Sequence, residues 1–470
     1  MTRNAATPRV ADKPASVISG GSPTEGSEPS ASSRSSSSRS ADLYARAKKV
    51  LPGGVSRNAV LRDPFPVYVD HASGCRVTDV DGVTRLDFAN NMASLIHGHA
   101  NPRIVEAVTQ QLTRGTAFTL GTEAEVRYAE HLAARNPSFE RLRFVNSGTE
   151  AIMVALKAAR AFTGRPMIAK AEGAYHGIYD YAEVSQAPSP ANWGSPERPS
   201  RVPLVHGTPT SVLDEVAVIP FNQTDRAIAI LDEHADRLAC VLLDLMPHRV
   251  GLNPASPEFV AAIREWTQRR GVLLVIDEVI TFRAEYAGLQ SHYGVTPDLT
   301  AMGKIIGGGF PIGAVAGRAD VMDVLNPHAT PLKFPHSGTF SANPVSMTAG
   351  LMAMEMFDKA AVTRLNALAA RARSGIERAI RGTGVGACVT GHGSLLRVHM
   401  TPDAPTDFRE AYAGPEQARR LKALLAHMFD RGILLINTAS AAFSTPMGDA
   451  EVDALVDAFR SGFEMLAKMD

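Results

Sequence analysis

The stretch Gly271-Val-Leu-Leu-Val-Ile-Asp-Glu-Val-Ile-Thr281 decides the fold and points to the site. An apolar run rich in β-branched residues that ends in an acid is typical of a buried strand of a parallel sheet. Such a strand places Asp277 at the edge of the sheet, where an ionised carboxylate is costly unless a cation meets it. Lys304 follows 27 residues later, directly before Ile305-Ile-Gly-Gly-Gly309, where glycines let the backbone approach another group closely.

Asp277 and Lys304 together match the needs of pyridoxal 5′-phosphate (PLP). This cofactor requires an acid beside its protonated pyridine nitrogen and an amine that forms a Schiff base with it. The alternative interpretation is a core aspartate that caps the next turn and a surface lysine in a loop. These two residues alone leave both interpretations open.

Helical and apolar segments alternate from about residue 120 to residue 277. This alternation indicates an α/β fold whose mostly parallel sheet carries helices on both faces. Helices are predicted at 42–50, 102–113, 123–135, 149–163, 225–234, 257–270, 344–357, 361–380 and from 449 onward. Strands are predicted at 67–70, 75–79, up to 88, 142–145, 167–171, 216–220, 240–245 and 272–277, with antiparallel-looking strands at 394–399 and 432–435.

The change in sequence character along the chain predicts four segments. Residues 1–40 are rich in serine and poor in bulky apolar residues, so we expect disorder. Their arginine and serine content also resembles an organelle transit peptide, although their acids and lack of amphipathic periodicity weaken that idea. Residues 41–90 and 344–470 are expected to build a small α+β domain, and residues 91–343 a large domain.

The overall composition excludes several classes of function. Lys+Arg and Asp+Glu both number 48 in 470 residues, which gives no support to a nucleic-acid partner or an anionic membrane surface. No run of 18 apolar residues predicts a transmembrane helix. Three cysteines (Cys75, Cys240 and Cys388) form neither a disulfide framework nor a zinc motif. We therefore expect a reduced, cytoplasmic protein without a metal.

Three further motifs contain residues suited to holding a phosphate or a flat ring. Ser147-Gly148-Thr149 runs from a strand into a helix and offers hydroxyls and N–H groups at a helix start, where phosphates bind; an ordinary helix cap is the alternative. Tyr175-His176-Gly177 follows the next strand, where an aromatic ring could stack on a heterocycle or simply pack on the core. Thr339 lies in a glycine-containing loop and could add a hydroxyl, although a plain turn explains that motif equally well.

Taken together, these motifs resemble the class III aminotransferases. These are PLP enzymes of fold type I that include glutamate-1-semialdehyde aminomutases and aromatic β-amino acid aminotransferases. The resemblance covers the chain from about Leu51 to Asp470. It rests, in the order of the family, on Pro52-Gly-Gly, Asn146-Ser-Gly-Thr-Glu, Tyr175-His-Gly, Asp277-Glu-Val, Gly303-Lys-Ile-Ile-Gly-Gly-Gly and Gly338-Thr-Phe-Ser-Ala-Asn-Pro.

The resemblance implies a role for each matching residue. Lys304 would form the Schiff base and carry the substrate proton, while Asp277 would pair with the pyridine nitrogen. Thr339 would reach the phosphate of the neighbouring subunit, which implies a homodimer with shared active sites. The residues expected to hold the cofactor are Ser147, Gly148, Thr149, Tyr175, His176, Asp277, Val279, Lys304 and Thr339.

The substrate is expected to be an amino carboxylic acid, with a β-amino acid as a candidate donor and a 2-oxo acid as acceptor. Arg57 lies close to where related enzymes keep an arginine for the substrate carboxylate, and a surface salt bridge is its alternative. Ile178 stands where many ω- and γ-amino acid aminotransferases have an arginine, which argues against a 4-aminobutyrate-type donor. A noncatalytic protein on the same fold, a decarboxylase and a racemase are further alternatives.

An aminomutase, which moves the amino group within one substrate, is the main alternative. The proline-rich segment 187–209 and Thr281-Phe-Arg283 both differ from the aminomutase pattern, and both lower its odds. A further departure from the family is Asp244-Leu-Met-Pro-His-Arg-Val-Gly251, in place of the usual Glu-Pro and glycine-rich stretch. His248 and Arg249 could therefore enter the site, or belong to a reshaped solvated loop.

Overall fold

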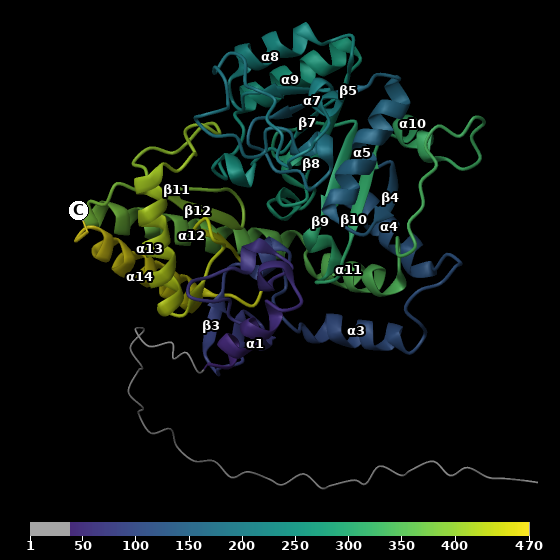
Figure 1. The fold of residues 1–470 in the computed structure, drawn as a ribbon. Helices are drawn as coiled ribbons and strands as arrows, with labels where there is room; N and C mark the ends of the chain where they lie inside the picture. The colour runs from purple at the N-terminus through teal and green to yellow at the C-terminus, as the bar shows by residue number, and fades with distance from the viewer. Residues whose placement is uncertain (1–37, 470) are drawn as a thin grey trace, which may run out of the picture.

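A seven-stranded sheet forms the centre of residues 38–469, the part of the chain that the computed structural model describes (Figure 1). The segment predicted to be disordered lies outside this part up to residue 37. In order across the sheet the strands are β4 (Arg141–Val145), β10 (Gly313–Gly317), β9 (Leu299–Gly303), β8 (Leu273–Asp277), β7 (Leu238–Leu243), β5 (Met167–Ala171) and β6 (Val216–Ile219). β10 is antiparallel to both of its neighbours, and the pairs from β9 to β6 are parallel.

Helices cover both faces of this sheet, as the alternating pattern predicted. On one face lie α5 (Gly148–Thr163), α7 (Thr210–Asp214) and α10 (Ala319–Met322), which share an apolar core with the strands. On the other face lie α8 (Thr224–Glu233) and α9 (Pro257–Arg270) (Figure 1). The parallel strands therefore end at one common edge, where loops can gather side chains from several strands.

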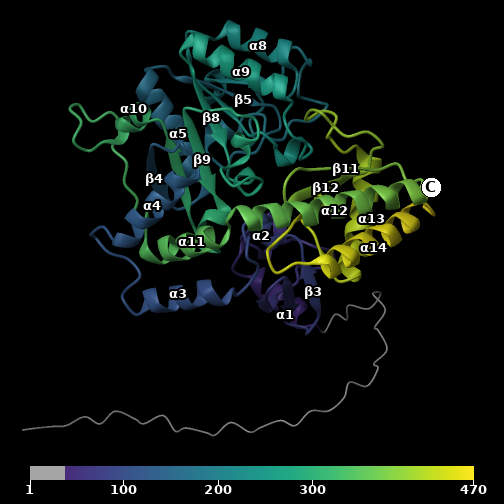
Figure 2. The same cartoon turned by 180° about the vertical axis from the view of Figure 1, so that it is seen from behind.

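A second body of secondary structure lies beside the large sheet (Figure 2). Its three antiparallel strands are β11 (Cys388–Thr390), β12 (Leu395–His399) and β14 (Ser440–Ala442). They share a core with α12 (Lys359–Thr383), α13 (Pro415–Asp430) and α14 (Asp449–Leu466). A four-stranded sheet consists of β1 (Val69–Ser73), β2 (Arg76–Asp79), β3 (Thr84–Asp87) and β13 (Ile433–Leu434). It joins an N-terminal segment of the described chain to a C-terminal one.

The structure differs from the sequence prediction at a few elements. β13, predicted to be antiparallel, pairs in parallel with β3, because the residues that close the small body return beside its first strands. α1 (Arg39–Ala47) starts before the predicted residue 42, since the Ser38 side chain accepts a bond from the Ala41 N–H and caps the helix. β9 and β10, which were not predicted, complete the large sheet.

The remaining helices flank these layers. α3 (Pro102–Leu112) and α4 (Glu123–Arg135) pack against α11 (Pro344–Met356), and α2 (Asn90–Ala93) and α6 (Asp180–Glu183) are single turns. The three cysteines are free, as predicted. No helix among residues 38–469 is long and apolar enough to cross a membrane.

Candidate active site

Asp277 is the last residue of β8 and is almost completely buried. Its Oδ2 lies 2.7 Å from Nδ1 of His176, and its Oδ1 accepts the backbone N–H of Val279 at 2.9 Å. Burial lowers the pKa of His176, so the ring is neutral at neutral pH and its Nδ1–H donates to the carboxylate. Nε2 of His176 is buried and has no hydrogen-bond partner among the described residues.

Lys304 follows the next strand of the sheet, β9, on the same edge. Asp277 is paired in register with Ala301, three residues before Lys304, because β8 and β9 are parallel neighbours. Lys304 opens a single 3-10 turn, Lys304–Gly307, and has a positive φ of 48°, a conformation that costs a non-glycine residue energy and is common at functional sites. Burial lowers the pKa of the Lys304 amine, while Asp277 and Asp244 act in the opposite direction. Within residues 38–469 this amine has no hydrogen bond or ion pair, so it is free to react.

The segment predicted to bind a phosphate lies directly beside these two residues. Ser147 caps α5 by accepting the N–H of Glu150 at 3.1 Å, which places Gly148 and Thr149 in the first turn. A Cβ at Gly148 would lie 2.8 Å from Cγ1 of Val279, and a Cβ at Gly303 would lie 3.3 Å from Cα of Gly148. The start of α5, the end of β9 and Val279, the second residue after β8, are therefore in close contact.

The loop after β5 closes this arrangement from another side. Gly177 has a φ of 88°, and a Cβ there would lie 2.5 Å from Oγ1 of Thr149. The turn therefore seats His176 in the interior while Tyr175 stays 45% exposed. Val279 is partly exposed as well. A hydroxyl-bearing helix start, a buried carboxylate and an unpaired amine thus surround one place, which suits a flat, phosphorylated aldehyde cofactor.

Asp244 is a site residue that was not predicted from the sequence. Asp244 directly follows β7, next to β8, and is buried with its Oδ1 bound to the N–H of Met246 at 2.9 Å. Burial raises its pKa well above the ordinary value, and the neighbouring Asp277 adds to this. The signal was available, because an acid that follows a buried strand in a parallel sheet ends at the same edge as Asp277.

His248 connects the site to the small sheet. Its Nε2 lies 3.2 Å from Oγ of Ser440 and 3.1 Å from Oγ1 of Thr438, and its carbonyl accepts a bond from Arg397. Burial lowers the pKa of His248 to about 3, and the positive charges of Arg397 and Lys304 contribute. Arg249 is exposed.

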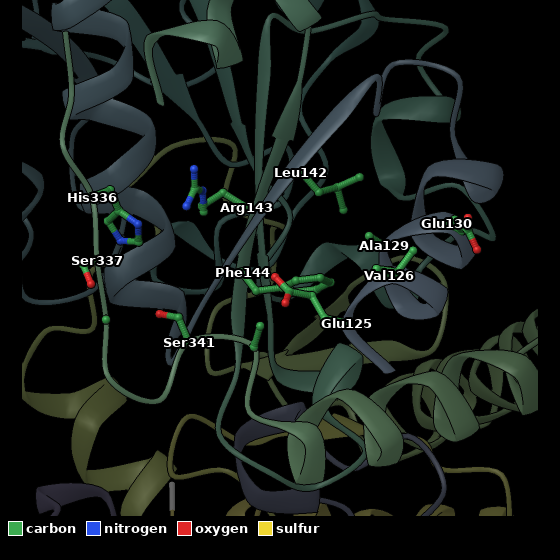
Figure 3. Close-up of a pocket in the computed structure, with 12 residues that line it drawn as sticks. Glu125, Val126, Ala129, Glu130, Leu142, Arg143, Phe144, His336, Ser337 and Ser341 are labelled. Atoms are coloured by element: carbon green, nitrogen blue, oxygen red, sulfur yellow. The ribbon is translucent and has the colours of Figure 1, made fainter. Parts of the chain in front are cut away.

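Two residues predicted to belong to the site, Thr339 and Arg57, are exposed. Thr339 is exposed and has no hydrogen bond to the start of α5 within the described part of the chain. Its loop, residues 336–342, faces β4 and α4 across a groove of about 540 Å³ (Figure 3). Arg57 is also exposed, and its Nη1 donates to Oδ1 of Asn91 at 2.8 Å.

A mostly parallel sheet flanked by helices, with Asp277 and Lys304 at the ends of adjacent strands, defines a fold type I PLP-dependent enzyme. When bound, PLP serves as an electron sink for the substrate. Asp277 lies close enough to Lys304 to raise the pKa of its amine, against the effect of burial.

Comparison with known proteins gives the family. The model of the class III aminotransferases matches residues 41–459, so the chain belongs to the class III aminotransferases, which depend on PLP. It is 36% identical over 397 residues to the glutamate-1-semialdehyde 2,1-aminomutase of Methanobrevibacter smithii, an alignment covering 84% of this chain and 90% of that protein.

Two solved structures are similar over nearly their whole length. An omega-transaminase from Sphaerobacter thermophilus is 47% identical, with a TM-score of 0.90 and coverage of 93% of this chain and 99% of that one. A β-phenylalanine aminotransferase from Variovorax paradoxus is 32% identical, with a TM-score of 0.79 and coverage of 90% and 93%. Relatives of this chain thus include both an aminomutase and aminotransferases.

Proposed function

We propose that this enzyme transfers an amino group from a β-amino carboxylic acid to a 2-oxo acid. The observation that supports a carboxylic acid as amino donor is the environment of Arg57. Its guanidinium is exposed, holds only the neutral side chain of Asn91, and has no ion pair among residues 38–469. It is therefore available to bind a substrate carboxylate, and a guanidinium does so with two parallel hydrogen bonds.

Arg57 is connected to the site through the segment that contains α2. It lines a cavity of about 240 Å³ together with Asn91 and Met92 of that helix. A Cβ at Gly309, in the glycine turn after Lys304, would lie 3.3 Å from Cδ2 of Leu95, just beyond the helix. A carboxylate held by Arg57 would thus be positioned by the same backbone that supports the lysine turn.

We assign the chemical roles to residues as follows. Lys304 would hold the cofactor through its Nζ, and the same amine would take up and return the proton of the substrate carbon, which its lowered pKa favours. Asp277, oriented by His176, would hold the proton on the pyridine nitrogen. The cofactor ring would lie between Val279 and Tyr175, with its phosphate at Ser147, Gly148 and Thr149.

The segment between β5 and β6 favours amino transfer between two molecules over the aminomutase reaction. An aminomutase holds its intermediate beneath a mobile loop, whereas this segment is tied to the body of the protein. Arg409 binds both carboxylate oxygens of Glu172 and donates to the carbonyls of Trp193, Gly194 and Ser195. The identity to an aminomutase of Methanobrevibacter smithii is the observation that favours the second candidate, intramolecular amino transfer.

We further propose a homodimer in which Thr339 reaches the phosphate of the partner's site. The loop of Thr339 is exposed in its own subunit, and Phe340 beside it is 59% exposed. Leu120, in the segment between α3 and α4, is 81% exposed. Contiguous apolar patches left in solvent mark surfaces that another chain covers, and we propose that these side chains belong to such a patch. Sedimentation velocity of the purified protein tests this, and a monomer at micromolar concentration would rule out shared sites.

The test of the proposed reaction is the visible absorption of the lysine-bound cofactor when a β-amino acid is added without any 2-oxo acid. A transferase that accepts this donor loses the band, because the amino group stays on the cofactor. Persistence of the band would instead favour the aminomutase or an α-amino acid donor. Arg57→Gln should slow the loss and raise the KM of the donor roughly 10- to 100-fold, the cost of losing about 1.5–3 kcal/mol from a charged hydrogen bond. Arg46→Gln, a matched change of an exposed arginine on α1, should leave the KM unchanged.

A further inference from the structure

A second group of side chains with metal-binding chemistry lies apart from the residues assigned to the cofactor. The ligand atoms of Glu285, His292 and His392 all lie within 4.8 Å of one another. Nε2 of His392 is 3.2 Å from Oε1 of Glu285, and the rings of His292 and His392 have centroids 4.8 Å apart. We infer that these three residues form a binding site for a divalent transition-metal ion of the zinc class.

The donor set selects this class of ion. Two imidazole nitrogens and one carboxylate oxygen suit Zn²⁺ and its neighbours Co²⁺ and Ni²⁺, whereas Ca²⁺ and Mg²⁺ prefer oxygen donors alone. Glu285 and His392 are partly buried, and His292 is exposed. Three protein ligands with one side open to solvent leave a fourth tetrahedral position for water.

The backbone that carries two of the ligands is held firmly in place. Gly393, next to His392, has a φ of 57°, and a Cβ there would lie 2.7 Å from Cα of Ala284, next to Glu285. Nδ2 of Asn366 donates to the carbonyl of Ala284 at 2.8 Å. The two backbone segments are therefore in contact before any ion binds, so that binding would require the ligand side chains to close in but would leave these backbones in place.

The third ligand, His292, lies in a turn that is hydrogen-bonded to the residue after β8. His292 closes the turn Leu289–Ser291, and Gln290 in this turn donates its backbone N–H to Oε1 of Glu278 at 2.7 Å. Glu278 is the residue after Asp277. An ion bound here would thus join the segment after β8 to the loop between β11 and β12 of the small sheet.

One negative and one positive side chain act on the cluster, those of Glu285 and Arg373. The guanidinium of Arg373 is partly neutralised by backbone carbonyls, since its Nη1 donates to those of Gly393 and Leu395 at 3.0 and 2.8 Å. Glu285 supplies the one negative charge among the three ligands. The alternative is a plain hydrogen bond between His392 and Glu285, with the ring of His292 packed beside that of His392 at an angle of 51°. This alternative predicts no affinity for metal.

The test is a titration of the dialysed, cofactor-loaded full chain with Co²⁺, whose visible bands report its coordination. We expect one equivalent to bind and to give the strong absorption of a tetrahedral site, while Zn²⁺ displaces it and raises the melting temperature. His292→Ala and His392→Ala should each weaken Co²⁺ binding by more than about 100-fold, since each removes a direct ligand. The absorption of the lysine-bound cofactor should stay unchanged, which separates this site from the active site.

His71→Ala is the matched control. Nδ1 of His71 lies 3.0 Å from Oδ2 of Asp70 on the surface, so this pair offers one imidazole and one carboxylate but no second imidazole. The variant should bind Co²⁺ as the wild type does. Failure of the wild type to bind stoichiometric Co²⁺, or equal binding by the wild type and His392→Ala, would overturn the inference.

Discussion

Nδ1 of His176 lies 2.7 Å from Oδ2 of Asp277, and both side chains are buried. The second carboxylate oxygen of Asp277 is bound by the backbone of Val279. The carboxylate is thereby fixed in direction at the end of β8. In the proposed reaction Asp277 would contact the cofactor, so His176 would be a positioning residue that acts through Asp277.

Removing the hydrogen-bond donor of His176 should weaken the binding of PLP. A hydrogen bond to a charged group contributes about 1.5–3 kcal/mol, so His176→Ala should lower PLP affinity roughly 10- to 100-fold. Fluorescence titration of the apoenzyme with PLP measures this. His176→Gln keeps a side-chain donor and should recover most of the affinity. If both variants bind PLP like the wild type, His176 does not position Asp277.

Lys304 should be the lysine that carries the cofactor. Borohydride reduction of the holoenzyme followed by peptide mapping should place the label on Lys304. Lys170 is the matched control, because it is fully buried and burial lowers its pKa to about 7. Its Nζ is held by the carbonyls of Ala171 and Val184, at 3.1 and 2.9 Å, and should carry no label. Label on Lys170 would refute the assignment.

Substitutions at Gly148 and Val279 should have non-additive effects on stability, because the two residues are in contact. Gly148→Ala places a Cβ about 0.6–1.2 Å too close to Cγ1 of Val279 for normal carbon contact, and such overpacking costs about 1–3 kcal/mol. The melting temperature and PLP affinity should both fall. Val279→Ala removes the clashing methyls, so the double variant should recover part of the loss. A double variant whose loss is the sum of the two single losses would show that the clash is relieved elsewhere.

Glu278 should make the stability depend on pH. Burial raises its pKa from 4.5 to about 7, so the folded chain holds this proton more tightly than the unfolded chain does. The stabilisation by the protonated carboxyl is fully present below pH 4.5. As the pH rises from 4.5 to 7 this stabilisation is lost, and the free energy of unfolding falls by about 3 kcal/mol.

Scanning calorimetry of Glu278→Gln at pH 5 and pH 8 measures this contribution. The melting temperature of the variant should rise relative to the wild type at pH 8 and change little at pH 5, because every other titrating group is common to both proteins. Glu130→Gln on the exposed side of α4 should show no such difference. Parallel pH profiles for the wild type and Glu278→Gln would show that Glu278 does not titrate in this range.

Much of the fold could be predicted because local patterns and the period of apolar residues are read within single segments. The bounds of α4, α9 and β5 match the prediction at both ends. The prediction that β13 is antiparallel was wrong, because a strand's partner is chosen by a distant part of the chain. The antiparallel β10 was missed because Gly313–Gly317 is short and rich in glycine and alanine, which weakens the strand signal.

The sequence by itself determined the α/β class, the family resemblance and the roles expected of Asp277 and Lys304, because strand ends and glycine turns are encoded locally. Only the tertiary structure decided which side chains meet. Asp277 and His176 are 101 residues apart in sequence, and Glu285 and His392 are 107 apart. Such contacts depend on strand order and on how the sheets pack against one another, and neither leaves a pattern within a single segment.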